Sequence, residues 1–224
     1  MKMRTSDLWL KLPVWALGLS PLAWGVWAFF SDGLGANPVE TLLLVPGRWA
    51  LTFLLLGLAV SPVRQFTGWG HIIRIRRLLG LFAFFYAALH FMIYLAVDQG
   101  LAWSFILEDI AERPFITVGF AALVLLMPLA VTSTRGWIRR LGRRWQLLHR
   151  LVYPATALGA LHFYWKVKAD TFWPLVAAGI LGALLLARVP RWMGWGVERR
   201  EGSGRKRGRG AVRVPPRETL AKGR

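Results

Sequence analysis

Four histidines and no cysteines limit the redox chemistry that this sequence can support. Without thiolates the chain cannot form a disulfide, a cysteine-bound iron–sulfur cluster or a covalent c-type haem. His90, His149 and His162 fall in or at the edge of apolar stretches, whereas His71 lies in a basic loop and is interpreted as an ordinary exposed residue. Ionisable residues at membrane depth are costly and indicate a functional site by default. These three histidines are therefore the first candidates for chemistry.

His90 and His162 are predicted to lie at the same depth in a membrane. Each follows a basic residue by 12 or 13 positions and precedes an aspartate by eight. At a rise of about 1.5 Å per residue, both lie nearer the acidic side of the membrane. Two imidazoles at one depth, on helices that run in the same direction, are what a bis-histidine haem requires. The competing interpretation is an interhelical hydrogen bond of the kind that membrane bundles use.

His149 is predicted to lie at the opposite membrane edge. It precedes His162 by 13 residues, which corresponds to about 20 Å of helix. That position suits either a second haem or a docking site for an electron donor. On an ideal helix the two side chains point about 140° apart, and Pro154 between them is a candidate kink. The number of haems, one or two, is therefore left open.

Membrane-spanning helices are the elements expected to position these histidines. A hydrophobic content of 55% and a mean hydropathy of +0.43 indicate lipid rather than water as the solvent. A hydrocarbon core of about 30 Å needs about 20 apolar residues in a helix. The sequence has six candidate stretches, at 12–30, 48–62, 78–97, 115–132, 149–165 and 172–189. The predicted fold class is therefore an all-α polytopic membrane helix bundle of about six transmembrane helices.

The basic residues predict the orientation of these spans. Of 29 Lys and Arg residues, 24 lie in segments 1–11, 61–77, 133–147 and 188–224, whereas the alternate loops carry seven of the 11 acidic residues and few basic ones. Basic loops remain on the cytoplasmic side. Both termini are therefore expected in the cytoplasm, and the acidic loops of a bacterial inner-membrane protein would face the periplasm.

The sequence divides into a membrane domain at 1–190 and a basic tail at 191–224. The tail is rich in Arg, Gly and Pro, so it cannot bury enough apolar surface to fold alone. We interpret it as a cytoplasmic segment that lies against anionic membrane lipid, and no nucleic-acid partner is expected because no aromatic residue follows Trp195. The sequence has no room for a flavin or nicotinamide domain. No internal repeat is evident, which gives an inverted-repeat transporter no support.

Several motifs, taken together, resemble a known family. They are DGLGANP at 32–38, RIRRLLGL at 74–81, RPFITVG at 113–119, TST at 132–134 and LGRRWQLLHRLVY at 141–153, together with His90 and His162. The chain resembles the MsrQ family, formerly YedZ, the haem-containing membrane subunits of bacterial periplasmic protein-methionine-sulfoxide reductases. This family lies within the ferric-reductase-like transmembrane superfamily. The resemblance covers about residues 8–189.

The resemblance implies b-type haem, one or two, with His90, His149 and His162 as axial ligands of the iron and with His90 and His162 as the natural pair. It implies a multi-pass protein of the bacterial inner membrane that serves as the electron-transfer subunit and has no catalytic residues of its own. Electrons would come from the quinone pool or a cytosolic flavin reductase and pass to a periplasmic molybdopterin subunit, MsrP, which repairs methionine sulfoxide in proteins. FMN is a further cofactor that the resemblance implies.

Arg77, Arg150 and Lys168 are candidate partners for haem propionates or a quinone headgroup, although the positive-inside pattern explains the first two equally well. Two other functions remain open at this point. One is a ferric reductase or oxidase that acts on a small acceptor. The other is a haem-free transporter or assembly factor whose histidines relay protons or pack.

Overall fold

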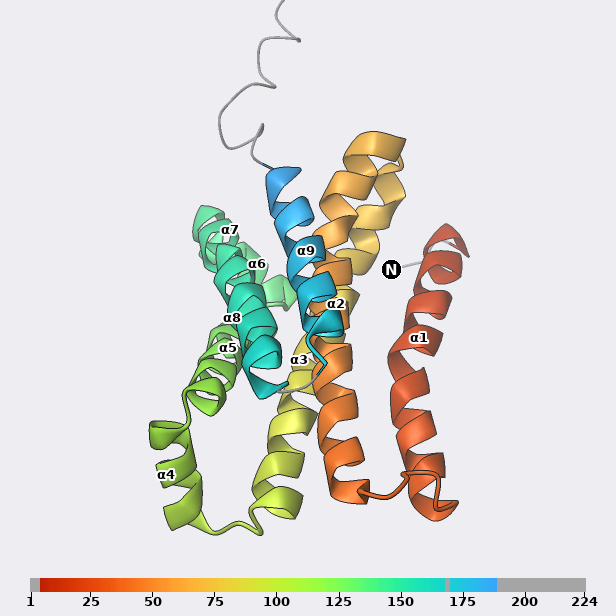
Figure 1. Cartoon of the computed structure of the whole chain (residues 1–224). Coiled ribbons are helices and arrows are strands. Elements are labelled where there is room, and N and C mark those ends of the chain that lie inside the picture. The colour runs from red at the N-terminus through yellow and green to blue at the C-terminus, as the bar shows by residue number, and fades with distance from the viewer. Residues whose placement is uncertain (1–4, 168–169, 189–224) are drawn as a thin grey trace, which may run out of the picture. The chain divides into compact units, whose positions relative to one another are not determined.

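The computed structural model describes residues 5–167 and 170–188, and within them it contains helices and no strand. The all-α prediction is therefore confirmed. The α-helices are α1 Thr5–Phe30, α2 Pro38–Thr67, α3 Arg76–Ile93, α4 Trp103–Glu112, α5 Pro114–Val131, α6 Arg135–Leu141, α7 Arg143–Leu148, α8 Val152–Lys166 and α9 Phe172–Leu186 (Figure 1). Two 3₁₀ turns, η1 Gly70–Ile75 and η3 His149–Leu151, and one π-helical turn, η2 Tyr94–Asp98, join them. One compact unit ends at Ala187, and the tail expected at 191–224 lies outside the described residues.

Four helical stretches of the described chain are long and apolar enough to cross a membrane, namely Trp9–Phe30, Pro38–Thr67, Gly70–Asp98 and Pro114–Val131. The counterparts of the fifth and sixth expected spans are α8 and α9, and each has 15 residues. The protein is therefore a multi-pass membrane protein, whereas the count of six spans and the cytoplasmic location of the termini stay predictions.

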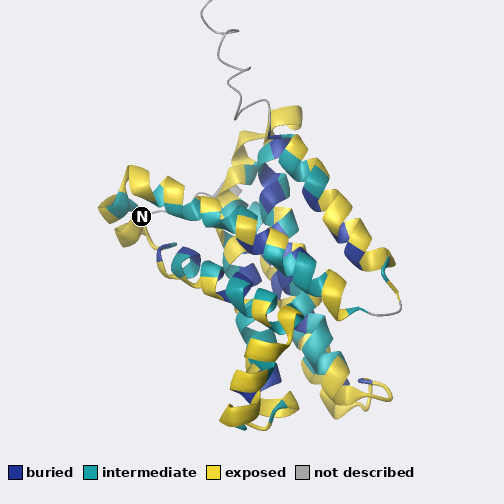
Figure 2. Cartoon of the chain, turned by 60° about the vertical axis from the view of Figure 1, so that its left-hand side comes forward, coloured by how far each residue is buried: buried dark blue, intermediate teal, exposed yellow. Residues whose placement is uncertain are grey.

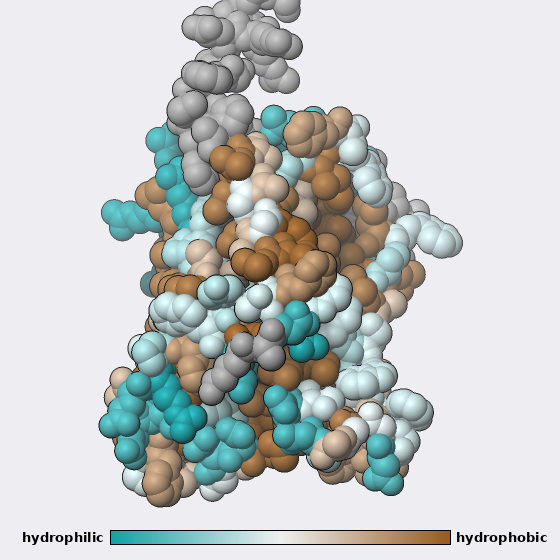
Figure 3. Space-filling model, viewed as in Figure 1, coloured by the Kyte–Doolittle hydropathy of each residue, from teal (hydrophilic) through white to brown (hydrophobic). Residues whose placement is uncertain are grey.

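Large apolar side chains cover the outer faces of these helices. Trp9 is 78% exposed and Phe30 is 81% exposed, and the exposed residues lie on the outside of the bundle (Figure 2). Apolar side chains extend over the middle of the face in Figure 3, and hydrophilic ones gather at its lower end over α4. A helix pairs its own backbone polar groups, so its apolar side chains can face hydrocarbon without cost. This surface is therefore the one in contact with lipid.

Helix α2 is the central element of the unit, since it packs against α1, α3, α8 and α9. Its start is fixed by Asn37, whose side-chain oxygen accepts a hydrogen bond from the backbone N–H of Glu40 at 3.3 Å, and by Pro38 in the first turn. Both residue types are favoured at helix starts. Its end is fixed by Gly68, which adopts a left-handed conformation at φ 70°.

The sequence predicts that the second span begins at Arg48, and this boundary is wrong. Helix α2 begins at Pro38, so Arg48 lies well inside it. Helix α4, in the acidic loop before α5, is also not expected from the sequence. Pro46 and Arg48 both resemble helix ends, although prolines are tolerated inside membrane helices when neighbouring helices hold them. Arg48 consequently lies ten residues inside a helix that is long and apolar enough to cross a membrane.

A buried aromatic cluster joins α1, α2 and α3. The ring of Phe53 stacks on Phe82 at 5.5 Å and on Tyr86 at 5.7 Å. The Tyr86 hydroxyl donates a hydrogen bond to the carbonyl of Gly18 at 2.6 Å, which satisfies a polar group that would be costly to bury unpaired. Because His90 follows Tyr86 by one helical turn, this cluster sets the position of His90 on α3.

Candidate haem-binding site

His90 of α3 and His162 of α8 face each other across the bundle. Their ring centres are 6.0 Å apart and their planes are inclined by 73°. Metal–imidazole nitrogen bonds are about 2 Å long, and a ring nitrogen lies about 1 Å from its ring centre, so an axially ligated metal places two ring centres about 6 Å apart. The observed separation therefore fits an iron held between the two imidazoles.

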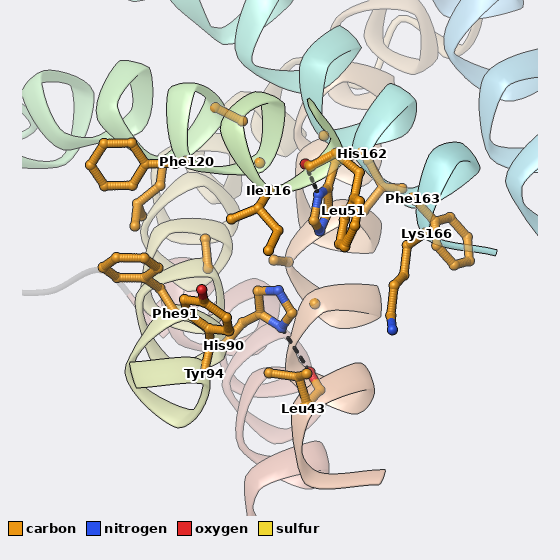
Figure 4. Close-up of a pocket in the computed structure, with 18 of the residues that line it drawn as sticks. Leu43, Leu51, His90, Phe91, Tyr94, Ile116, Phe120, His162, Phe163 and Lys166 are labelled. Carbon is orange, nitrogen blue, oxygen red and sulfur yellow. Dashed lines mark hydrogen bonds between the residues drawn. The ribbon is translucent and has the colours of Figure 1, made fainter. Parts of the chain in front are cut away.

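Hydrogen bonds to the main chain fix the tautomer of both rings. His90 Nδ1 lies 2.7 Å from the carbonyl oxygen of Leu43, and His162 Nδ1 lies 2.6 Å from that of Phe115. A carbonyl only accepts, so each Nδ1 carries the proton and each Nε2 keeps its lone pair. Metal-bound histidines are oriented in this way. The free nitrogens lie on the sides of the rings that face each other (Figure 4).

Two glycines allow the rings to reach these carbonyls. Gly47 and Gly119 each follow the accepting residue by four positions, one turn further along the helix. A Cβ atom at Gly47 would lie 3.1 Å from His90 Nδ1, and one at Gly119 would lie 2.6 Å from His162 Nδ1. A larger residue at Gly119 would therefore push the His162 imidazole away from its acceptor, whereas one at Gly47 would require the His90 ring to shift by only a few tenths of an ångström.

Both histidines line a cavity of about 330 Å³ between α2, α3, α5 and α8. Its volume falls within the usual range for sites that bind a small molecule or cofactor. Most of its lining is apolar, with leucine, alanine and phenylalanine side chains among the residues of these helices. Among the described residues, the ionisable ones that line it besides the histidines are Arg48, Tyr94, Asp98, Asp109, Arg113 and Lys166. An apolar cavity with two inward imidazoles and a polar end suits an amphipathic macrocycle such as haem.

A hydrogen-bonded group around Asp109 joins α4 to η2 and to Gln99, the residue after η2, at the polar end. Its carboxylate accepts hydrogen bonds from the hydroxyl of Tyr94 at 3.2 Å and from the amide of Gln99 at 3.3 Å. It also forms a salt bridge with Nε of Arg113 at 3.0 Å. The charge of Arg113 is therefore balanced within the protein.

Of the other predicted site residues, His149, Arg77 and Arg150 do not line this cavity. His149 lies in η3, where its ring stacks on Trp145 at 3.9 Å and its Nδ1 lies 3.1 Å from the Trp145 carbonyl oxygen. Its Nε2 is buried without a hydrogen-bond partner among the described residues. Arg77 and Arg150 are exposed and do not line the cavity, and Lys168 lies outside the described residues. The described cations that line the cavity are Arg48, Arg113 and Lys166, which the sequence does not single out.

The two halves of the site repeat at a spacing of 72 residues. Ala-Leu-His-Phe occurs at 88–91 and again at 160–163, and the same spacing separates Gly47 from Gly119. In each half the histidine bonds a carbonyl 47 residues before it. The expectation that the chain has no internal repeat is therefore wrong. Helices α2 and α5 run in one direction and α3 and α8 in the other (Figure 1), so the repeat is parallel and gives an inverted-repeat transporter no support.

Comparisons with known proteins identify the family. Residues 46–160 match the family described as "Ferric reductase like transmembrane component". A protein of Xanthomonas euvesicatoria pv. vesicatoria (strain 85-10), named "Protein-methionine-sulfoxide reductase heme-binding subunit MsrQ", is 52% identical over 194 residues, which cover 84% of this chain and 89% of that protein. The chain belongs to the MsrQ family. A protein of the same name from Rhodospirillum rubrum is 52% identical over 180 residues, which cover 80% of this chain and 86% of that protein.

Membership of the MsrQ family confirms the resemblance of the sequence motifs. It also agrees with the geometry of the site, because the MsrQ relatives are named as haem-binding subunits. The names do not state which residues bind haem. The assignment of His90 and His162 therefore rests on their spacing, tautomers and shared cavity.

Replacing His149 with alanine is expected to leave the haem between His90 and His162 in place, because His149 does not line their cavity. The measurement is a reduced-minus-oxidised absorption spectrum of the purified protein, with a pyridine-haemochrome count. An unchanged count indicates one haem, and a fall to half indicates a second haem at His149. Loss of the whole low-spin spectrum would contradict this prediction.

Proposed function

We propose that this chain is the electron-transfer subunit of a protein-methionine-sulfoxide reductase system in a bacterial inner membrane. His90 and His162 would hold a non-covalent b-type haem, which would supply a one-electron couple, and the subunit would deliver electrons to a periplasmic molybdopterin subunit of the MsrP type. The observation that carries the proposal is the pair of inward imidazoles, 6.0 Å apart at their ring centres, each with Nδ1 bonded to a main-chain carbonyl.

The chemistry of the site favours electron transfer over ligand binding. Haem supplies a one-electron couple, and a haem with both axial positions filled has no open site for oxygen. The residues of this chain would hold both axial positions, exclude water with the apolar cavity wall and orient the imidazoles through Leu43 and Phe115. Hydrogen bonds from Nδ1 to carbonyls strengthen the imidazoles as ligands and favour the ferric state.

The charge pattern supports electron flow toward the periplasmic side. The histidine pair lies near the ends of α3 and α8 that lead into the acidic loops, and these loops are expected on the periplasmic side. Electrons would leave the protein at that side. They would enter from the quinone pool or from a cytosolic flavin reductase.

The test is electron transfer in proteoliposomes that contain the full chain. A quinol analogue is added, haem reduction is followed at the α-band, and purified MsrP is supplied with methionine sulfoxide. The expected result is haem re-oxidation that requires both MsrP and its substrate. Re-oxidation by ferric citrate or oxygen at the same rate without MsrP would overturn the proposal in favour of a reductase of small acceptors, and colourless protein would overturn any haem function.

A further inference from the structure

The lining of the cavity is almost symmetric, so the symmetric residues alone cannot fix the rotation of a bound haem. The 72-residue repeat pairs His90 with His162 and Gly47 with Gly119, and it also pairs the lining positions 50 and 51 with 122 and 123. Two equivalent halves would hold a macrocycle by both faces. These symmetric halves would not determine which edge of the macrocycle lies between α3 and α5 and which lies between α2 and α8.

One side of the cavity is aromatic. Phe91 of α3 packs against Phe120 of α5, with ring centres 5.5 Å apart, and against Tyr94 at 6.1 Å. Figure 4 shows these three side chains together on one side of the histidine pair. This side, between α3 and α5, is here called the aromatic seam.

The opposite side, between α2 and α8, carries cations at the equivalent positions. The repeat pairs Phe120 with Arg48 and Tyr94 with Lys166, whereas Phe91 corresponds to another phenylalanine, Phe163. Both cations line the cavity, and Lys166 follows His162 by one helical turn. This side, with Arg48 and Lys166, is here called the cationic seam. The two seams therefore differ by two positive charges.

No carboxylate of the described residues forms a salt bridge with the cationic seam. In residues 5–167 and 170–188, Arg113 forms a salt bridge with Asp109, but neither Arg48 nor Lys166 forms one with a carboxylate. Arg48 lies ten residues, or about 15 Å, from the start of α2. A cation at such depth is costly unless an anion or a polar cavity accompanies it. The cavity that both cations line is therefore the place where an anion is expected.

We propose that Arg48 and Lys166 bind the two propionate carboxylates of the haem and so fix its rotation, with the propionate edge at the cationic seam and the apolar vinyl edge at the aromatic seam. The inference rests on the proposed function, because it requires haem between His90 and His162. Of the cations that the sequence singles out for this role, Arg77 and Arg150 do not line the cavity, and Lys168 lies outside the described residues. Ion-paired hydrogen bonds to a carboxylate are the strong class, and arginine can make two of them at once.

The test compares haemin with haemin dimethyl ester, in which both propionates are neutral esters. The full-length protein is loaded with either compound, and the dissociation rate is measured by transfer to an excess of apomyoglobin. From the wild-type protein the ester should dissociate faster than haemin, by roughly ten- to a hundredfold for each charged contact that esterification removes. In Arg48→Gln and Lys166→Gln, haemin should dissociate faster by a similar factor, whereas the rate for the ester should not change.

Two matched variants and a redox readout complete the test. Lys166→Arg keeps the charge and should keep the wild-type rate for haemin. Arg77→Gln removes an exposed cation that does not line the cavity and should have no effect. The haem midpoint potential should fall in Arg48→Gln and Lys166→Gln, because loss of a nearby cation favours the ferric state.

The outcomes separate this inference from the proposed function. Equal dissociation rates for haemin and the ester in the wild type would overturn the propionate assignment. Arg48 and Lys166 would then be expected to pair with lipid phosphate, and the proposal that His90 and His162 bind haem would be unaffected. Faster loss of both compounds in the variants would show a structural role and would also overturn it. A wild-type protein that bound neither compound would overturn the proposed function.

Discussion

Replacing His90 or His162 with alanine is expected to abolish the low-spin, six-coordinate haem spectrum, and each change should do so completely. The two rings lie on opposite sides of one cavity with their free nitrogens toward each other (Figure 4), so the loss of either leaves the iron with one protein ligand. A haem held by one imidazole is high-spin or dissociates during purification. Absorption and electron paramagnetic resonance spectra of the purified variants provide the measurement.

His71→Ala is the matched control, because His71 is exposed in η1 and does not line the cavity. It should keep the wild-type haem content. Retention of a full low-spin spectrum in either His90→Ala or His162→Ala would show that another side chain supplies the axial ligand. An equal response in the two ligand variants is the specific expectation, because the repeat places the two histidines in equivalent surroundings.

The pairing of His90 with His162 can be predicted from the sequence because membrane depth follows from counting. Charged residues mark where each span meets water, and the helical rise converts residue numbers into depth. Depth alone brings two histidines to one level, and the structure places their rings 6.0 Å apart. The same arithmetic places His149 at another level, and the structure keeps it away from their cavity.

The cations of the cavity cannot be found in this way. Arg48 resembles the end of a span, because a charge beside Pro46 normally marks one. The capping residues Asn37 and Pro38 mark the observed start of α2, ten residues before Arg48. In the sequence, two capping residues are a weaker signal of a helix start than the beginning of a long apolar run. Lys166 is predicted in the loop, although α8 extends to include it. Depth counting also says nothing about which side of a helix a residue occupies.

The internal repeat is carried by few positions of the sequence. Identical residues in the two halves are sparse, because most lipid-facing positions tolerate any apolar side chain. The positions that repeat in the Ala-Leu-His-Phe segments at 88–91 and 160–163 are those that hold or surround the site. An alignment of the two halves on these segments pairs Gly47 with Gly119, so the sequence contains a signal for both glycines as site residues.

Gly119→Ala is expected to impair haem binding far more than a single added methyl group suggests. The new Cβ atom would lie 2.6 Å from Nδ1 of His162, which is closer than such atoms approach without a shift of one of them. The imidazole would have to leave the Phe115 carbonyl. Overpacking of this kind costs about 1–3 kcal/mol, and each 1.4 kcal/mol corresponds to about a tenfold change in affinity. A haem dissociation rate raised roughly tenfold or more, measured by transfer to apomyoglobin, is the expected result.

Gly47→Ala and Gly80→Ala separate this effect from a general change in helix stability. At Gly47 the new Cβ atom would lie 3.1 Å from Nδ1 of His90, so a shift of a few tenths of an ångström suffices, whereas at Gly80 it would meet nothing within 4 Å. Alanine is otherwise the better helix former, by about 1 kcal/mol. Haem dissociation should therefore be fastest in Gly119→Ala, intermediate in Gly47→Ala and unchanged in Gly80→Ala. The same rate in all three variants would mean that the two glycines do not set the imidazole positions, and the ligand geometry would then have to be maintained by the carbonyl bonds alone.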